Sequence, residues 1–167
     1  MLPKIANSPK ELNQILNKFE WSCIVNNKKV EDTRENWNKY RILFPEQFLE
    51  LRAGCCWDYC NFQSEYFDEY FPEIEYKLLF MVDSEESNHT FMTYVENNKL
   101  KLFESSYKEY IGIYEFTDER EIIDFFVNKM KISHYNVYTY NKMNSYGISA
   151  DNFIEYILNE GKLVLSK

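Results

Sequence analysis

A thiol, an imidazole and a carboxylate follow one another in this chain of 167 residues, as Cys56, His89 and Glu104. A cysteine becomes a nucleophile when a neighbouring base takes its proton, and histidine is suited to be that base because it titrates near neutral pH. A carboxylate can orient the imidazole and stabilise its charged form. The three residue types therefore predict a covalent thiol enzyme, with Cys56 as nucleophile, His89 as base and Glu104 as orienting group.

The segment Gly54-Cys55-Cys56-Trp57-Asp58 predicts where the thiol lies. Gly54 lets the chain enter a turn without a side-chain clash, and a helical pattern runs from Cys56 to about position 71, before Pro72. Backbone N–H groups in a first helical turn lower the pKa of a thiol and can bind an oxyanion. Because a helix advances about 100° per residue, Cys55 and Cys56 cannot both face His89. Cys56 is the predicted nucleophile, and Cys55 is the alternative.

A hairpin predicts that the imidazole and the carboxylate meet. Two strand-like runs, residues 89–95 and 100–103, surround Asn97-Asn98, and asparagine tolerates the positive φ of a tight turn. The register that follows from this turn sets Glu104 opposite Phe91. His89 and Glu104 then project from the same sheet face as diagonal neighbours, at the edge of an apolar surface.

The remaining pattern predicts an α+β fold, in which helices are segregated from an antiparallel sheet. We expect further helices at residues 8–19, 45–51, 117–130 and 149–158, further strands at residues 76–82 and 135–140, and a loop at residues 26–40. No repeat or Pro/Gly/Ser linker divides the chain, so residues 1–167 are expected to form a single domain.

The charge balance excludes two classes of partner. The formal net charge is -8 and the isoelectric point is about 4.9, with no run of Lys or Arg. An acidic surface of this kind serves neither nucleic-acid phosphates nor anionic lipids. The first residues lack the apolar stretch of a signal peptide, and no run reaches membrane-spanning length. We therefore expect a cytoplasmic protein with no nucleic-acid or membrane partner.

The four cysteines predict free thiols in a reducing compartment. Cys55, Cys56 and Cys60 lack the paired Cys-x-x-Cys spacing of zinc sites, so we expect no metal and no cofactor. Cys23 and Cys60 are predicted to be inert core thiols. The amide of Gln47 is the candidate for a side-chain oxyanion donor.

Several motifs in order carry a resemblance to a known family. They are Tyr40-Arg41-Ile42-Leu43-Phe44-Pro45-Glu46, Gly54-Cys55-Cys56-Trp57-Asp58-Tyr59, His89-Thr90-Phe91, Leu102-Phe103-Glu104-Ser105-Ser106 and Gly112-Ile113. Over residues 40–116 the chain resembles the transglutaminase-like branch of the papain-like superfamily, and in particular small bacterial proteins with a Gly-x-Cys-Trp-Asp signature. The resemblance implies a papain-like core, with the nucleophile-bearing helix packed on an antiparallel sheet.

The resemblance also implies a site and its substrate. It matches Cys56 to the nucleophile, His89 to the base and Glu104 to the position usually taken by Asp, with a protein or peptide as substrate. No Gln stands at the spacing familiar from papain-like peptidases. Relatives hydrolyse peptides, transfer acyl groups to amines or have lost activity, so a catalytically inactive protein-interaction module is the alternative. The sequence does not determine the oligomeric state.

Overall fold

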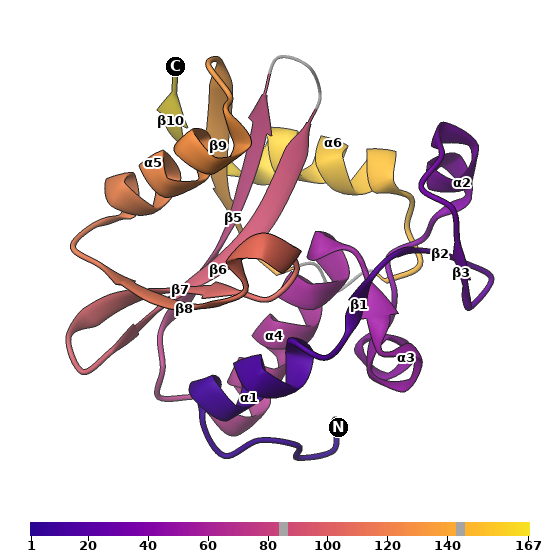
Figure 1. Ribbon diagram of the computed structural model, residues 1–167, viewed down its shortest axis with the longest axis horizontal. Helices are drawn as coiled ribbons and strands as arrows, with labels where there is room; N and C mark the ends of the chain where they lie inside the picture. Colours follow the sequence, from indigo (N-terminus) through magenta and orange to yellow (C-terminus); the bar gives the residue numbers. More distant parts are fainter. Residues whose placement is uncertain (84–86, 143–145) are drawn as a thin grey trace.

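The computed structural model describes residues 1–83, 87–142 and 146–167. Within these residues the largest sheet is antiparallel, with strand order β10-β9-β5-β6-β7-β8 (Figure 1). Its strands are β5 (Tyr76–Asp83), β6 (Asn88–Glu96), β7 (Lys99–Glu104), β8 (Gly112–Phe116), β9 (Tyr135–Tyr140) and β10 (Lys162–Ser166). The expected α+β class is confirmed, since helices and an antiparallel sheet form separate layers.

Helices cover both faces of this sheet. One apolar cluster contains residues of α1 (Pro9–Leu16), α3 (Pro45–Leu51), α4 (Cys56–Tyr70) and α6 (Ala150–Glu160), and a second contains residues of α5 (Glu119–Met130). Successive side chains of β5 alternate between them, since Phe80 belongs to the first cluster and Leu79 to the second. None of the helices in the described ranges is long and apolar enough to cross a membrane.

Local capping chemistry sets the beginnings of several helices. The Ser8 hydroxyl accepts a hydrogen bond from the N–H of Glu11 at the start of α1, and Pro9 occupies the first helical position. Asp118 and Ser149 accept equivalent bonds at the starts of α5 and α6. These helices lie where the sequence predicts them because each cap is a local signal.

The expected loop at residues 26–40 is wrong in part. The structure places the hairpin of β2 (Cys23–Val25) and β3 (Lys28–Val30) there, followed by α2 (Arg34–Lys39). Asn26 and Asn27 form the turn with φ of 52° and 59°, which is the conformation of Asn97 and Asn98 in the other hairpin. The same dipeptide therefore makes both turns, although the strands around the first carry little apolar pattern.

Two short strands bring the N-terminal part of the chain to the start of α4. β1 (Glu20–Trp21) pairs in parallel with β4 (Ala53–Gly54), and β4 leads directly into Cys55 and Cys56. Each strand has two residues, which is too short for a period-two pattern. This pair has no counterpart among the sequence-based expectations, nor do β8 and β10.

Candidate active site

His89 and Glu104 form the contact that the hairpin register predicts. The pairing of β6 with β7 runs from Glu96 and Lys99 to Met92 and Phe103, as the Asn97-Asn98 turn requires. Nε2 of His89 lies 2.7 Å from Oε2 of Glu104, and both residues are buried, with exposed fractions of 4% and 1%. A buried carboxylate at this distance fixes the orientation of the imidazole.

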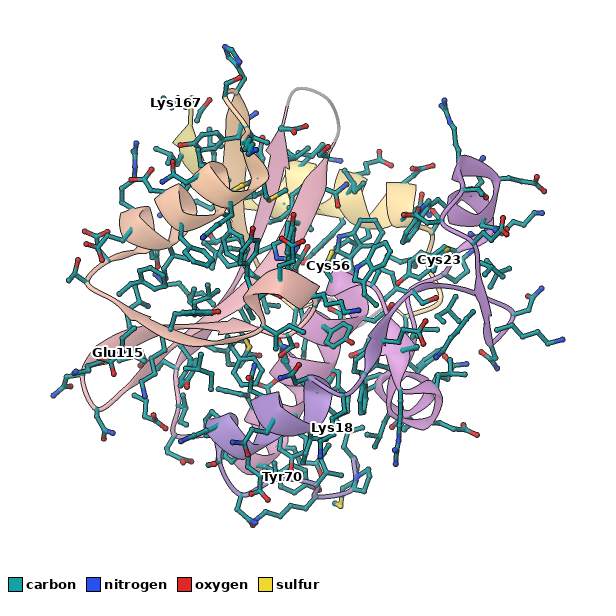
Figure 2. All side chains as sticks on the ribbon, in the orientation of Figure 1. Lys18, Cys23, Cys56, Tyr70, Glu115 and Lys167 are labelled. Carbon is teal, nitrogen blue, oxygen red and sulfur yellow. The ribbon has the colours of Figure 1, made fainter. Side chains whose placement is uncertain are left out.

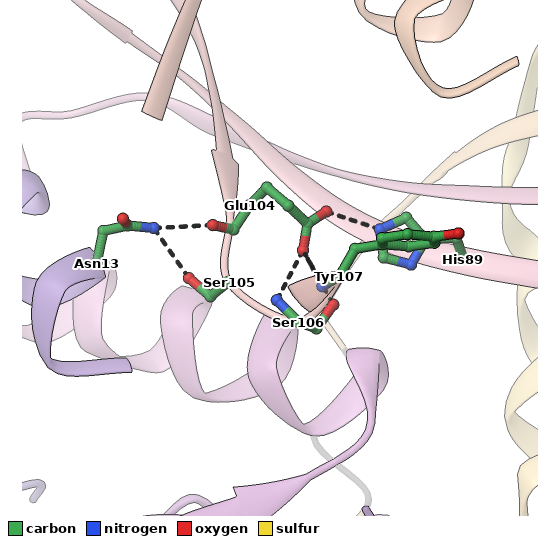
Figure 3. Close-up of polar contacts among 6 residues, drawn as sticks. All are labelled: Asn13, His89, Glu104, Ser105, Ser106 and Tyr107. Carbon is green, nitrogen blue, oxygen red and sulfur yellow. Dashed lines mark hydrogen bonds and ion pairs between the residues drawn. The ribbon is translucent and has the colours of Figure 1, made fainter. Parts of the chain in front are cut away.

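The second oxygen of Glu104 is saturated by donors from the segment that follows β7 (Figure 3). Oε1 accepts the N–H of Ser106 at 2.7 Å, the Ser106 hydroxyl at 3.1 Å and the N–H of Tyr107 at 2.8 Å. Burial raises the pKa of Glu104, but the imidazolium of His89 and these N–H donors outweigh it and hold the pKa below its usual range. Glu104 is therefore a carboxylate near neutral pH.

Asn13 anchors this carboxylate-bearing turn from the far end of the sequence. Its Nδ2 donates to the carbonyl oxygen of Glu104 at 2.9 Å and to the hydroxyl of Ser105 at 3.1 Å (Figure 3). Asn13 belongs to α1 and is buried. The position of Glu104 is thus fixed through both its side chain and its own carbonyl group.

The start of α4 brings Cys56 to the first part of β6, where His89 and Thr90 act on its thiol. The register between β6 and β7 runs only as far as Met92 and Phe103. Cys56 begins α4 at the centre of the molecule, while Tyr70 marks the other end of the same helix (Figure 2). The His89 ring and the backbone N–H of Thr90 both act on the Cys56 sulfur and lower the pKa of the thiol. Because Glu104 occupies Nε2, Nδ1 is the ring nitrogen left for the thiol.

The two ionisable partners stabilise each other as a thiolate and an imidazolium. The neighbouring Cys55 has the largest effect in lowering the pKa of Cys56 to about 5, and His89 and the Thr90 N–H act in the same direction against burial. Burial opposes a charged imidazole, yet Glu104 and Cys56 together raise the pKa of His89 to about 10. Between these values the nucleophile is ionised and its base is protonated.

Asp58 holds the backbone before the nucleophile from inside the protein. Its carboxylate accepts the N–H of Cys55 at 2.9 Å, the N–H of Leu43 at 2.9 Å and the hydroxyl of Tyr40 at 2.7 Å. Burial raises the pKa of Asp58 to about 6 despite these donors. Asp58 therefore caps the start of α4.

Position 54 has no room for a side chain. A Cβ atom at this position would lie 2.7 Å from Oδ2 of Asp58 and 2.9 Å from the ring of Phe48. Both contacts are shorter than real Cβ atoms tolerate. The glycine in the motif therefore allows Asp58 to approach the backbone behind the thiol.

A cleft of about 810 Å³ opens over Cys56. It is lined by residues from four parts of the chain, namely Asn17, Phe19, Glu20 and Trp21, then Cys56 and Tyr59, then Asn88 and His89, and then Ser105, Ser106, Tyr107, Lys108 and Ile111. Its volume is in the range of small-ligand and peptide sites. The His89 ring itself packs against Tyr107 and Phe126, with ring centroids 5.7 Å and 5.0 Å away.

Cys23, Cys60 and Gln47 lie outside this constellation. Burial raises the pKa of Cys60 well above its usual value and that of Cys23 to about 11, as expected of core thiols. The proposed role of Gln47 as oxyanion donor is wrong, because Gln47 does not line the cleft and its Nε2 donates to Oδ1 of Asn27 at 3.4 Å, while its Oε1 accepts the N–H of Phe44. Its amide caps α3.

Several residues of the site have no signal in the sequence. Asn13 and Trp21 come from the N-terminal part of the chain and meet the motif residues only through α1 and the β1–β4 pair. At the rim of the cleft the Tyr107 ring stacks on the ring of Tyr110, with their centroids 4.9 Å apart. Of these residues, only Trp21 could have been noticed in the sequence, as an aromatic residue far from the cysteine motif.

The comparisons with known proteins assign no identity to this chain. No family model matches it, and no characterised protein matches it either. In the described residues, no group of three or more His, Cys, Asp or Glu side chains is placed to hold a metal ion. The function is therefore argued from the geometry of the site.

Proposed function

We propose that this protein is a cysteine-dependent acyl-transfer enzyme of the papain-like, transglutaminase-like type. The observation that carries the proposal is the chain of contacts from Cys56 through His89 to Glu104 at the floor of an open cleft. A core-edge histidine that is merely satisfied needs one hydrogen-bond partner. Here Nε2 of His89 lies 2.7 Å from a buried carboxylate, and the same ring lowers the pKa of the Cys56 thiol, which lines the cleft with it.

The proposed reaction has two half-reactions, acylation and deacylation, and Cys56, His89 and Glu104 act in both. The Cys56 thiolate attacks the carbonyl carbon of an amide, forming a C–S bond, while the first-turn N–H groups of α4 donate to the oxyanion. The imidazolium of His89 gives its proton to the leaving amine as the C–N bond breaks, leaving a thioester. His89 then takes a proton from water or from an acceptor amine, which attacks the thioester and restores the thiolate. Glu104 keeps the ring oriented throughout.

The proposed substrate is a protein or peptide in a reducing cytoplasmic compartment, where all four thiols stay free. An inactive interaction module with the same cleft is the alternative. The two differ in whether Cys56 can be acylated, since a binding cleft needs no competent nucleophile.

An activated ester tests the proposal without knowledge of the substrate. Mixing the protein with p-nitrophenyl acetate should release about one equivalent of p-nitrophenol per protein in a burst, followed by slower turnover. Mass spectrometry of the quenched sample should locate the acetyl group on Cys56. Cys56→Ala should lose the burst, while Cys23→Ala should keep it. If the folded protein shows no burst, or if acetyl groups are spread over other residues, the inactive module is supported.

A further inference from the structure

The buried ring of Tyr59 carries a hydroxyl that no protein group satisfies. Tyr59 belongs to α4 and is only 2% exposed, and within the described parts of the chain its hydroxyl forms no hydrogen bond. By contrast, the hydroxyl of the buried Tyr40 bonds Asp58, and that of the buried Tyr66 bonds the backbone of Ala6. A buried polar group without a partner costs free energy. Phenylalanine would serve the packing at this position equally well, so the hydroxyl needs another explanation.

This hydroxyl opens into the cleft. The enclosed polar atoms that lack a partner belong to other side chains, among them Thr90 and Tyr140, so the Tyr59 oxygen is not sealed in the core. Tyr59 lines the cleft together with Cys56. Its ring makes a T-shaped contact with Phe48, with the ring centroids 4.8 Å apart. The hydroxyl is therefore held by a packed ring and meets whatever occupies the cleft.

Tyr59 lies one helical turn after the nucleophile. Residues three apart on a helix lie on the same face, with Cβ atoms about 5–6 Å apart. Aromatic side chains in helices lean toward the N-terminus, which in α4 is the end that carries Cys56. Tyr59 thus faces the part of a ligand that lies closest to the sulfur, next to the carbonyl group under attack.

The hydroxyl stays protonated near neutral pH. Burial raises the pKa of Tyr59, and the nearby Asp58, Glu104 and Glu20 raise it further. A neutral phenol donates one hydrogen bond and accepts another. A secondary amide offers a matching N–H and carbonyl oxygen on adjacent atoms, whereas an alkyl chain offers neither. An alkyl chain at this place would displace water from the hydroxyl without replacing its hydrogen bonds.

We propose that the Tyr59 hydroxyl is a specificity-determining group that hydrogen-bonds an amide of the acyl donor next to the carbonyl under attack, so that Cys56 accepts acylamino acyl groups in preference to alkyl ones. This inference rests on the function proposed above and names the kind of acyl group that the site selects. A site that hydrogen-bonds a polar group of its substrate rejects an analogue without that group, because the polar group of the site is then left unpaired.

Two esters with acyl chains of equal length test this selection. They are p-nitrophenyl N-acetylglycinate, which has an amide next to the reacting carbonyl, and p-nitrophenyl pentanoate, which has none. The Cys56 thiolate attacks the ester carbonyl, forms the thioester and releases p-nitrophenolate, which reports the second-order rate constant of acylation. Dividing each constant by that of the same ester with free cysteine removes the difference in intrinsic reactivity. In the wild-type protein, the corrected ratio of the amide ester to the alkyl ester should be at least about 3-fold.

Tyr59→Phe removes the hydroxyl and keeps the ring against Phe48. The corrected ratio should fall about 3- to 10-fold in this variant, the effect of one lost hydrogen bond. Tyr94→Phe is the matched control, because Tyr94 is also 2% exposed and has no hydrogen bond from its hydroxyl in the described residues, but does not line the cleft. Its ratio should equal that of the wild type. A wild-type ratio near one overturns the inference without any substitution, so the test does not depend on the folding of Tyr59→Phe.

The outcomes separate this inference from the function on which it rests. If neither ester acylates Cys56, the proposed function fails and the inference fails with it. If both esters acylate Cys56 and the corrected ratio is the same in wild type, Tyr59→Phe and Tyr94→Phe, the function stands. Tyr59 is then a packing residue whose hydroxyl bonds no part of the acyl donor.

Discussion

Replacing Glu104 by glutamine should sharply lower the pKa of His89. The substitution keeps an oxygen for the three donors from Ser106 and Tyr107, so the local fold has the partners it needs. At the other end it puts an amide nitrogen where Oε2 now lies 2.7 Å from Nε2 of His89. An amide N–H needs an acceptor there, which only the neutral ring supplies.

The size of the effect follows from the buried charge that is lost. Burial alone would lower the pKa of His89, yet with Glu104 and Cys56 beside it the value is about 10. One opposite charge at contact distance typically shifts a pKa by about 1–3 units, each unit corresponding to about 1.4 kcal/mol. We therefore expect the pKa of His89 to fall to about 8 in Glu104→Gln.

Proton NMR titration measures this directly, because the chain has only two histidines and His134 is exposed. Glu115→Gln is a matched control, since it removes one negative charge from an exposed ion pair with Lys99. A His89 titration that is the same in wild type, Glu115→Gln and Glu104→Gln would refute the role given to Glu104.

Three further substitutions test the surroundings of the thiol. Cys55→Ala should raise the pKa of Cys56 by about one unit, slowing alkylation about five-fold near pH 5 but not near pH 8, whereas a uniform loss would make Cys55 the nucleophile. Gly54→Ala places a methyl group 2.7 Å from Asp58 and should lower the free energy of unfolding by about 1–3 kcal/mol in urea titrations. An unchanged midpoint would contradict the close approach. Asn13→Ala should cost about 1–2 kcal/mol and also shift the histidine titration, and a loss of stability without that shift would make its role purely structural.

The contact between His89 and Glu104 was predictable from local chemistry. Asn97 and Asn98 adopt φ of 55° and 60°, and this tight turn determines the pairing of every residue behind it. Since side chains alternate with a period of two, the register alone puts both groups on one face. The start of α4 was predictable for a similar reason, because Gly54 and Asp58 are close neighbours of Cys56 in the sequence.

The contacts of the N-terminal residues Asn13 and Trp21 with the site were not predictable in this way. The bond from Asn13 to the carbonyl of Glu104 spans 91 residues, and no pattern within a window of ordinary length reports it. The two-residue strand that carries Trp21 is defined only by its partner. Gln47 shows the opposite error, since its nearness in sequence to the cysteine motif suggested a role as oxyanion donor, but its side chain lies outside the cleft and bonds Phe44 and Asn27.

Mapping which cysteine iodoacetamide modifies first is the most direct test of a Cys56 nucleophile. At about pH 6 a thiol of pKa about 5 is roughly 90% ionised, whereas one of pKa about 11 is ionised to about one part in 100,000. A short exposure followed by peptide mass spectrometry should therefore find the label on Cys56, with Cys23, Cys55 and Cys60 unmodified. Equal and slow labelling of all four in the folded protein would contradict the proposed thiolate–imidazolium pair, and with it the enzyme.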